Sequence, residues 1–323
     1  MKKIRWGILG CGDVTEIKSG PGFQKANGSE LVAVMRRNGN LAKDYALRHN
    51  VPKWYNDAGA LINDPEVDAV YIATPPSSHK KYTLDVAKAG KPVYVEKPMA
   101  LNYSECVEMV RACDDAKVPL FTAYYRRALP RFVKIKSLID DGAIGEVRFV
   151  NTQFRQTPSE NDKKGIYNWR VDPSIAGCGY FCDLGSHMID LLQFYFGPII
   201  SAEGYSTNQG KLYSAEDLIS AIFKFESGIQ GVGNWCFTSN DNLDQTEIVG
   251  SKGKIIYSNF SDSAFVLIKE EKAEEIYIKH PDHVAQSLIQ NIVDELLGSG
   301  ESPSTGKSGA STSWVLDKIL GRL

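Results

Sequence analysis

The sequence lacks the patterns that mark a secreted, metal-binding or membrane protein. It has six cysteines among 323 residues, with no C-x-x-C pair and no paired loop spacing. Neither a zinc site nor a disulfide framework is therefore indicated. No segment reaches the roughly 18 apolar residues that a membrane span needs. The apolar stretch near the start is rich in glycine and lasts only to Cys11, so we expect a first strand there rather than a signal peptide. A reducing cytoplasm fits these absences best.

An excess of charge of either sign is also missing. Lysine and arginine total 37 against 39 aspartates and glutamates, a formal net charge of -2. This balance gives no electrostatic reason to expect nucleic acid or an anionic membrane as a partner, so a small soluble ligand is favoured. The chain is also longer than the roughly 250 to 300 residues at which a single core stops growing, which predicts two domains.

Alternating strands and helices predict an α/β domain over residues 1–123. The expected strands are 4–9, 31–35, 69–73, 92–95 and 120–123. Helical patterns lie between them at 41–49, 78–89 and 103–116. This β-α-β alternation is typical of a Rossmann-type, doubly wound parallel sheet.

Residues 124–323 predict an α+β domain with a large, open and mostly antiparallel sheet. Helices are expected at 132–141 and 180–196, followed by strands at 217–225, 228–237, 245–250, 253–258, 264–269 and 274–279. Runs of strands without helices between them favour antiparallel pairing. Helices at 284–297 and 312–320 end the chain, and the last can pack back on the first domain. The Gly/Ser/Pro-rich loop at 298–309 between them is expected to be mobile.

A glycine turn follows the first expected strand. Gly10 and Gly12 would let the backbone turn tightly and approach a pyrophosphate, and Asp13 and Val14 open the next helix, whose N-terminus favours an anion. The third position of the usual glycine pattern is Thr15. An ordinary tight turn is the alternative, but the strand-to-helix context favours dinucleotide binding.

The clearest candidate for chemistry is the charged pair Glu96-Lys97 before Pro98, at the end of a short buried strand. The carboxyl ends of strands in such a sheet face the ligand crevice, so the Lys97 ammonium can act on a substrate. A surface ion pair is the alternative. Thr74 and Pro75 end a neighbouring strand and belong to the same crevice. His79 follows them, either at the cofactor or, slightly favoured, as a solvent-exposed histidine.

A second candidate lies in the expected helix at 180–196. Asp183 and His187 stand four residues apart and Asp190 follows at i+7, so all three would share one face. A carboxylate beside an imidazole suits a general acid or base, because histidine titrates near neutrality. A solvent-exposed polar stripe is the alternative, which the apolar, glycine-rich flanks disfavour.

The end of the second expected strand bears on coenzyme choice. Arg36 and Arg37 stand where domains that prefer NAD tend to carry an acid for the ribose 2′-hydroxyl. Two guanidiniums suit a 2′-phosphate instead, so NADP(H) is expected to be preferred over NAD(H), which stays possible. The alternative is that both arginines begin a solvated loop.

Together these motifs resemble the Gfo/Idh/MocA oxidoreductase family over essentially the whole chain. The order is Gly10-Cys11-Gly12, Glu96-Lys97-Pro98, Asn168-Trp169-Arg170, Gly177-Cys178-Gly179 and Asp183-x-x-x-His187. The resemblance implies an N-terminal NAD(P)-binding domain, and a C-terminal domain that contacts substrate and often forms a homo-dimer or homo-tetramer through its sheet. Cys178 departs from the family's usual glycine triple.

The resemblance also implies roles for single residues. The catalytic positions are Lys97, Asp183 and His187. The expected cofactor-binding residues are Gly10, Gly12, Asp13, Val14, Arg36, Arg37, Thr74, Pro75, His79, Glu96 and Lys97. The expected substrate-binding residues are Lys97, Tyr125, Arg126, Trp169, Arg170, Asp183 and His187; the four new ones could equally be packing aromatics or surface arginines.

We therefore expect a dehydrogenase or reductase that moves a hydride between a nicotinamide and a carbinol carbon of a sugar, polyol or diol. Two rivals stay open within the same resemblance. One is an NAD-dependent glycosidase, in which hydride transfer is transient and the net reaction is hydrolysis. The other is a regulator that senses the dinucleotide without turnover, which the intact catalytic set disfavours.

Overall fold

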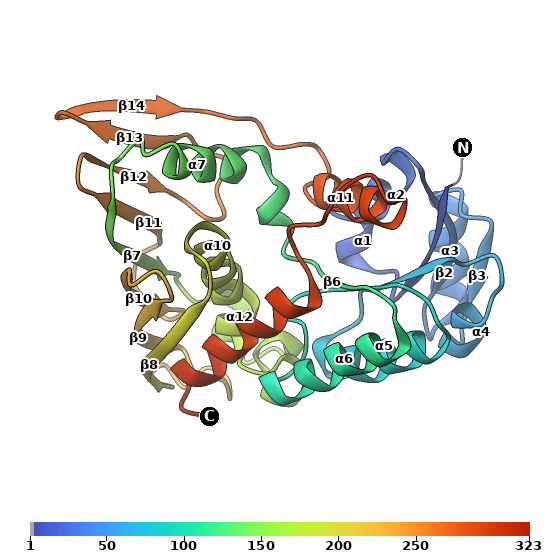
Figure 1. Cartoon of the computed structure of the whole chain (residues 1–323). Helices are drawn as coiled ribbons and strands as arrows, with labels where there is room; N and C mark the ends of the chain where they lie inside the picture. The colour runs from blue at the N-terminus through green and yellow to red at the C-terminus, as the bar shows by residue number, and fades with distance from the viewer. Residues whose placement is uncertain (1–2) are drawn as a thin grey trace. The chain divides into compact units, whose positions relative to one another are not determined.

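The computed structural model describes residues 3–323, which form two compact units (Figure 1). The first contains the described residues up to Leu129 together with Pro281–Ala310, and the second contains Pro130–His280 with Ser311–Leu323. The sequence-based division places every residue after 123 in one domain. The structure instead groups residues 281–310 with the first unit and the C-terminal segment with the second.

The first unit is built on a six-stranded parallel sheet. Its strands are β1 Ile4–Leu9, β2 Ser29–Met35, β3 Lys53–Tyr55, β4 Ala69–Ile72, β5 Val93–Val95 and β6 Leu120–Thr122. Their order is β3-β2-β1-β4-β5-β6, which is the doubly wound Rossmann arrangement predicted from the sequence. The sequence did not reveal β3, because its three residues are only half-buried or exposed and leave no apolar pattern.

Helices cover both faces of this sheet, and each face has its own hydrophobic core. Helices α2 Gly20–Lys25, α3 Gly39–Arg48 and α11 Gln286–Leu296 pack with one core, and α4 Ala58–Ile62, α5 His79–Lys88 and α6 Tyr103–Ala116 with the other. Figure 1 shows α11 beside α2, although the two are far apart in sequence. Leu288 and Ile289 of α11 are fully buried in the first core, which explains why residues 281–310 belong to this unit.

The second unit is built on an eight-stranded mixed sheet. Its strands are β7 Val147–Arg155, β8 Ile199–Thr207, β9 Leu218–Phe225, β10 Gln230–Cys236, β11 Leu243–Gly250, β12 Gly253–Tyr257, β13 Phe265–Lys269 and β14 Lys272–Ile276. Their order is β14-β13-β12-β11-β7-β10-β9-β8, and every pairing is antiparallel except that of β7 with β10. This confirms the predicted mostly antiparallel sheet.

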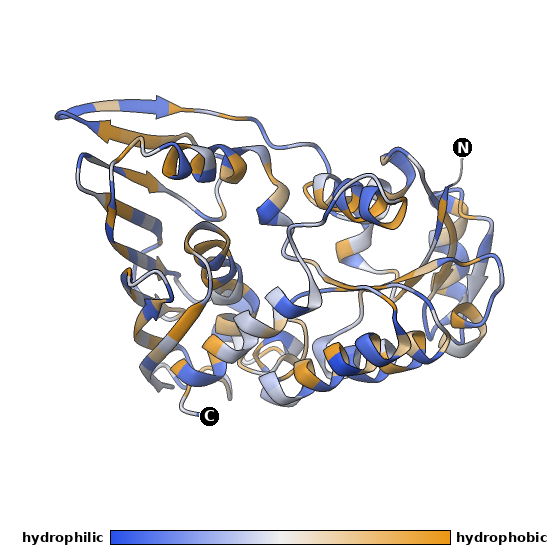
Figure 2. Cartoon of the chain, viewed as in Figure 1, coloured by the Kyte–Doolittle hydropathy of each residue, from blue (hydrophilic) through white to orange (hydrophobic). Residues whose placement is uncertain are grey.

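Buried and exposed residues alternate along several of these strands, so one face of the sheet is packed and the other is exposed. Burial alternates strictly along β9, and Figure 2 shows hydrophobic and hydrophilic bands along the strands; three of the five residues of β14 are charged. The sequence analysis missed β7 and β8 because polar residues interrupt their apolar positions. In β8, for example, only two of nine residues are buried.

Helices pack with this sheet inside the second unit. They are α7 Pro130–Asp140, α8 Glu160–Lys163, α9 Pro173–Ala176, α10 Ser186–Phe196 and the part of α12 Gly306–Ile319 from Ser311 onward. The expected helix at 180–196 is divided: Phe181–Gly185 forms a π turn, with hydrogen bonds to the fifth residue back, and α10 follows directly. Within residues 3–323, no helix is long and apolar enough to cross a membrane.

The loop at 298–309 is ordered, contrary to the sequence-based expectation of mobility. Ser304 is fully buried and its hydroxyl donates a hydrogen bond of 2.7 Å to the carbonyl of Thr122. Thr305 pairs with Phe121 of β6 in a β-bridge. Small residues here allow close packing on the sheet edge, and they are not a sign of disorder.

Candidate active site

The glycine turn after β1 has the geometry that a dinucleotide requires. Gly10 has a φ of +91°, and a Cβ there would lie 2.8 Å from the Thr74 methyl carbon and 3.0 Å from the Ala73 carbonyl. A Cβ on Gly12 would meet only the Gly10 carbonyl, at 3.8 Å. The first position therefore needs glycine for its conformation and the second leaves open space against the backbone, so the turn fits a pyrophosphate.

Thr15 replaces the third glycine and stabilises the turn. Its hydroxyl donates to the Gly12 carbonyl at 2.8 Å and accepts from the Gly12 amide at 3.0 Å. Gly12 thus caps α1, Asp13–Ile17, whose first residues Asp13 and Val14 present amides with no intrahelical acceptor. The side chain of Thr15 is fully buried, so the substitution preserves the helix start.

Arg36 and Arg37 are exposed directly after β2. Met35 joins this strand end to the glycine turn, because its carbonyl accepts hydrogen bonds from the amides of Gly10 at 2.8 Å and Cys11 at 3.2 Å. Burial raises the pKa of the Cys11 thiol to about 11, and the Arg36 charge opposes this shift. Arg36 therefore lies close enough to the turn to act on a group bound there.

His79 is buried and hydrogen-bonded to two loops, contrary to the favoured expectation of a solvent-exposed ring. Its Nε2 lies 2.7 Å from the Thr74 carbonyl oxygen and its Nδ1 lies 3.1 Å from that of Pro98. Burial lowers the pKa of His79 to about 4. Both ring nitrogens face main-chain carbonyls, so His79 joins the loop after β4 to the loop that carries Lys97. Thr74 lies beside the glycine turn, and Pro75 follows it in the same loop.

Lys97 lies just after β5, and two hydrogen bonds hold the carboxylate of the preceding residue, Glu96. The Tyr71 hydroxyl donates to Glu96, and the Lys97 amide donates to the second Glu96 oxygen at 3.1 Å. Burial raises the pKa of Glu96, and the positive charge of Lys97 opposes that shift. The Lys97–Pro98 peptide bond is cis. The half-buried Lys97 thus has a carboxyl neighbour that is itself fixed in place.

Tyr125 and Arg126 pair with one another in the turn after β6. The Arg126 guanidinium lies 4.9 Å from the Tyr125 ring centroid and donates to its hydroxyl at 3.1 Å. Arg126 is only 6% exposed, so it is not the surface arginine that the sequence left as an alternative.

In the second unit, the structure brings Trp169, Arg170 and Asp183 together. The Arg170 guanidinium stacks 4.6 Å from the Trp169 ring, and its Nε lies 3.8 Å from an Asp183 carboxylate oxygen. Asp183 lies in the π turn, an irregularity that is frequent at functional sites. His187 follows in the first turn of α10, is 4% exposed and lies 6.2 Å from the Phe260 ring.

Asp190, the third residue of the expected polar face, lies one turn further along α10. It is buried on α10 and accepts a hydrogen bond of 3.3 Å from the Thr312 hydroxyl. Nearly the whole of α10 is buried, so the helix has no solvent-exposed polar stripe.

The sequence analysis missed a polar cluster that supports the Trp169 turn. Tyr180 donates to Asp162 at 3.0 Å and accepts from the Asn168 side chain at 3.0 Å. Asp162 is 4% exposed and also accepts from Ser159. Of these residues, only Asn168 belongs to a sequence motif. Ser159, Asp162 and Tyr180 come together only in the folded protein.

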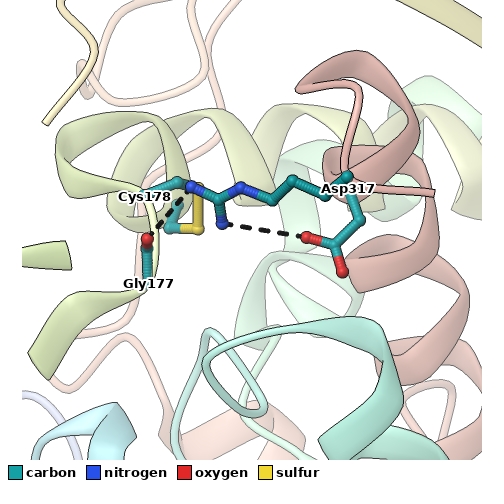
Figure 3. The surroundings of a disulfide bond; sticks show 5 residues. Gly177, Cys178 and Asp317 are labelled. Atoms are coloured by element: carbon teal, nitrogen blue, oxygen red, sulfur yellow. Dashed lines mark hydrogen bonds and ion pairs between the residues drawn. A yellow bond between two sulfur atoms is a disulfide. The ribbon is translucent and has the colours of Figure 1, made fainter. Parts of the chain in front are cut away.

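The largest departure from expectation is a disulfide between Cys178 and Cys182 (Figure 3). Their i, i+4 spacing is neither a C-x-x-C pair nor a paired-loop spacing, so the sequence pattern does not predict the bond. The bond joins the glycine-flanked turn to the residue before Asp183. Arg322 donates to the Gly177 carbonyl at 3.3 Å and lies 3.9 Å from Asp317, so the chain's C-terminal segment braces the same turn.

Comparison with known proteins agrees with this architecture. Residues 4–124 match an oxidoreductase family with an NAD-binding Rossmann fold, and residues 132–256 match the GFO/IDH/MocA C-terminal domain. The chain therefore belongs to the Gfo/Idh/MocA family of NAD(P)-dependent oxidoreductases.

Individual relatives cover nearly all of the chain. An "Oxidoreductase P35" from Formosa agariphila is 40% identical and aligns over 99% of each protein. A 1,5-anhydro-D-fructose reductase from Ensifer adhaerens is 26% identical over 94% of this chain and 92% of its own. An aldose-aldose oxidoreductase from Caulobacter crescentus, solved with glycerol, is 24% identical with a TM-score of 0.86 over 99% of this chain and 97% of its own, and shows the same fold.

Proposed function

We propose that this protein is a dehydrogenase or reductase that exchanges a hydride between NAD(P) and a carbinol carbon of a sugar, polyol or related diol. The observation that carries the proposal is the position of Lys97, held beside Glu96 directly after β5. The glycine turn follows β1 of the same sheet, at the edge where ligands of such sheets bind. One relative is a 1,5-anhydro-D-fructose reductase, which fits this substrate class.

The proposed chemistry divides between three side chains. When bound, the nicotinamide supplies the site that gives or accepts the hydride. Lys97 donates a charged hydrogen bond to the substrate oxygen and stabilises the negative charge that develops there. His187 takes the hydroxyl proton in oxidation or returns it in reduction, and Asp183 anchors the substrate or the imidazole.

Aromatic and guanidinium groups are proposed for substrate recognition. Tyr125 with Arg126, and Trp169 with Arg170, form two aromatic–arginine pairs. Such pairs present a flat ring beside hydrogen-bond donors, which suits the apolar face and the hydroxyl groups of a sugar.

We also propose NADP(H) as the preferred coenzyme and self-association through the second unit's sheet. Arg36 and Arg37 stand at the strand end that reads the ribose, where no acid is present. On the exposed face of the sheet, the paired Ile222 and Val232 are 60% and 45% exposed, and Tyr205 is 87% exposed. Apolar side chains gathered on one face favour a homo-oligomer.

A substrate screen tests the function and separates it from its rivals. The protein is incubated with sugars, inositols and vicinal diols plus oxidised cofactor, with the corresponding ketones plus reduced cofactor, and with aryl glycosides. We expect a change in nicotinamide absorbance with a member of the first two sets. Glycoside cleavage without net cofactor reduction would instead identify the glycosidase, and tight cofactor binding without any turnover would identify the regulator.

A further inference from the structure

The Tyr71 hydroxyl is buried where two parts of the first unit meet. Tyr71 lies on β4 and is fully buried. Its hydroxyl is hydrogen-bonded to the Glu96 carboxylate and lies 3.2 Å from the Ser19 hydroxyl. The Ser19 hydroxyl in turn lies 3.2 Å from the carbonyl oxygen of Val14, in helix α1, which Gly12 caps. A chain of polar groups therefore joins the glycine turn's helix to the residue before Lys97.

The single proton of each hydroxyl gives this chain a direction. When Glu96 is ionised, Tyr71 donates to the carboxylate and can accept from Ser19. When Glu96 is protonated, the carboxyl donates to Tyr71, Tyr71 donates to Ser19 and Ser19 donates to the Val14 carbonyl. Protonation of Glu96 thus reverses the donor and acceptor roles along these hydrogen bonds without moving a heavy atom.

Charged and titratable groups face Glu96 from several elements. Burial is the largest influence and raises the pKa of Glu96, while Lys97, the Tyr71 hydroxyl and Lys18 act in the opposite direction. Tyr94 lies two residues before Glu96 on β5, and its pKa is raised well above the usual range by burial and further by the Glu96 charge. Burial keeps the pKa of Tyr71 well above its usual range, so Tyr71 stays a neutral donor.

We propose that Tyr71 is a positioning residue for Lys97: its hydroxyl holds the Glu96 carboxylate, and thereby a negative charge, beside the Lys97 amide and ammonium. This inference rests on the proposed function, in which Lys97 acts on the substrate oxygen. Glu96 is half-buried, and the Tyr71 hydroxyl, which is fully buried, supplies a fixed donor to one of its two carboxylate oxygens. Ser19 extends the same support to the helix after the glycine turn.

The chain offers a matched control in Tyr94. Its ring stacks on that of Tyr71 with centroids 4.8 Å apart, and the two residues are paired in register on β4 and β5. Tyr94 is equally buried, but within the described residues its hydroxyl has no hydrogen-bond partner. Tyr71→Phe and Tyr94→Phe therefore remove the same atom from adjacent core positions, and only the first removes a hydrogen bond.

The test compares pH profiles of kcat/KM for the two variants and the unaltered protein. Loss of a donor that favours ionised Glu96 raises the pKa of that carboxyl, so the ionised form appears only at higher pH. We expect the acidic limb to move up by about one pH unit in Tyr71→Phe, since a hydrogen bond to a charged group contributes at least that much. At pH values below the shifted limb, kcat/KM of Tyr71→Phe should be about 10-fold lower than that of the unaltered protein. At pH values above the limb, the two should be equal. Tyr94→Phe should keep the original profile, and Ser19→Ala should shift it in the same direction by less.

A second measurement works without any substrate. The Glu96 carboxyl is titrated by ¹³C NMR in protein labelled at glutamate, with its resonance assigned by its loss in Glu96→Gln. An upward shift of its titration in Tyr71→Phe alone supports the inference. Equal behaviour of the two tyrosine variants, or an unchanged limb in Tyr71→Phe, overturns it. Absence of turnover by the unaltered protein, with the NMR shift still present, contradicts the proposed function instead.

Discussion

Residues 96–99 are held by buried side chains on both sides of Lys97. Tyr71 contacts Glu96 before the lysine, and the His79 ring contacts the carbonyl of Pro98 after it. The sequence identifies Lys97, because a charged pair and a proline directly follow a buried strand. It does not identify the role of His79, since the carbonyls that contact its two ring nitrogens belong to Pro98 and Thr74, nineteen and five residues away in the sequence.

Lys97→Met should lower kcat by on the order of 100-fold or more while cofactor affinity changes little. The ammonium acts on oxygen charge that develops mainly in the transition state, so its loss is felt in turnover. Steady-state kinetics and fluorescence titration with the reduced cofactor measure the two effects. Lys88→Met, on the exposed last turn of α5, is the control and should leave both unchanged. Near-normal turnover in Lys97→Met would remove this residue from the chemistry.

Arg36→Ala should weaken NADPH binding by about 10-fold or more and leave NADH binding almost unchanged. The guanidinium would lose a charge-assisted hydrogen bond to the 2′-phosphate, which is absent from NADH. Parallel titrations of the unaltered protein and the variant measure the ratio. If the unaltered protein binds NADH as tightly as NADPH, the coenzyme assignment is wrong.

At the scale of elements, regular amphipathic segments were predicted well and irregular ones were not. Helix α6 has the predicted bounds, and β1 lies where its apolar run predicts it. The sequence predicts one continuous helix over 180–196, but residues 181–185 form a π turn, which positive φ angles at Gly177 and Gly179 precede. Such a turn depends on tertiary contacts, including the disulfide and Arg322, that no local periodicity encodes.

The disulfide should make a measurable contribution to stability. The bond closes a very short loop, so the chain-entropy argument gives about 2 kcal/mol for the loss of unfolding free energy in the double variant Cys178→Ser/Cys182→Ser. Urea denaturation measures this, and Cys236→Ser, which alters a cysteine outside the disulfide, is the control.

Thiol titration of the unfolded protein checks the bond itself. The structure predicts four reactive thiols before reduction, since six cysteines less the bonded pair leave four, and six afterwards. Six thiols without a reductant, or equal stability of the double variant and the control, would show that the bond is not formed.

At the scale of the whole molecule, the sequence predicted both kinds of sheet but not which segments join each unit. Residues 281–310 follow the last strand of the second sheet and yet complete a core of the first unit through α11. An apolar helix face shows that a helix is buried but not which core receives it. The candidate catalytic residues also belong to different units: Lys97 lies in the first unit, and Asp183 and His187 lie in the second.

Isotope transfer tests the central claim of hydride exchange most directly. A substrate found in the screen is deuterated at its carbinol carbon and incubated with oxidised cofactor, and the reduced nucleotide is analysed by mass spectrometry. We expect the deuterium to appear in the nicotinamide ring and turnover to show a primary isotope effect. Reduced cofactor without deuterium, or product formed by glycoside cleavage with no net reduction of the cofactor, would contradict it.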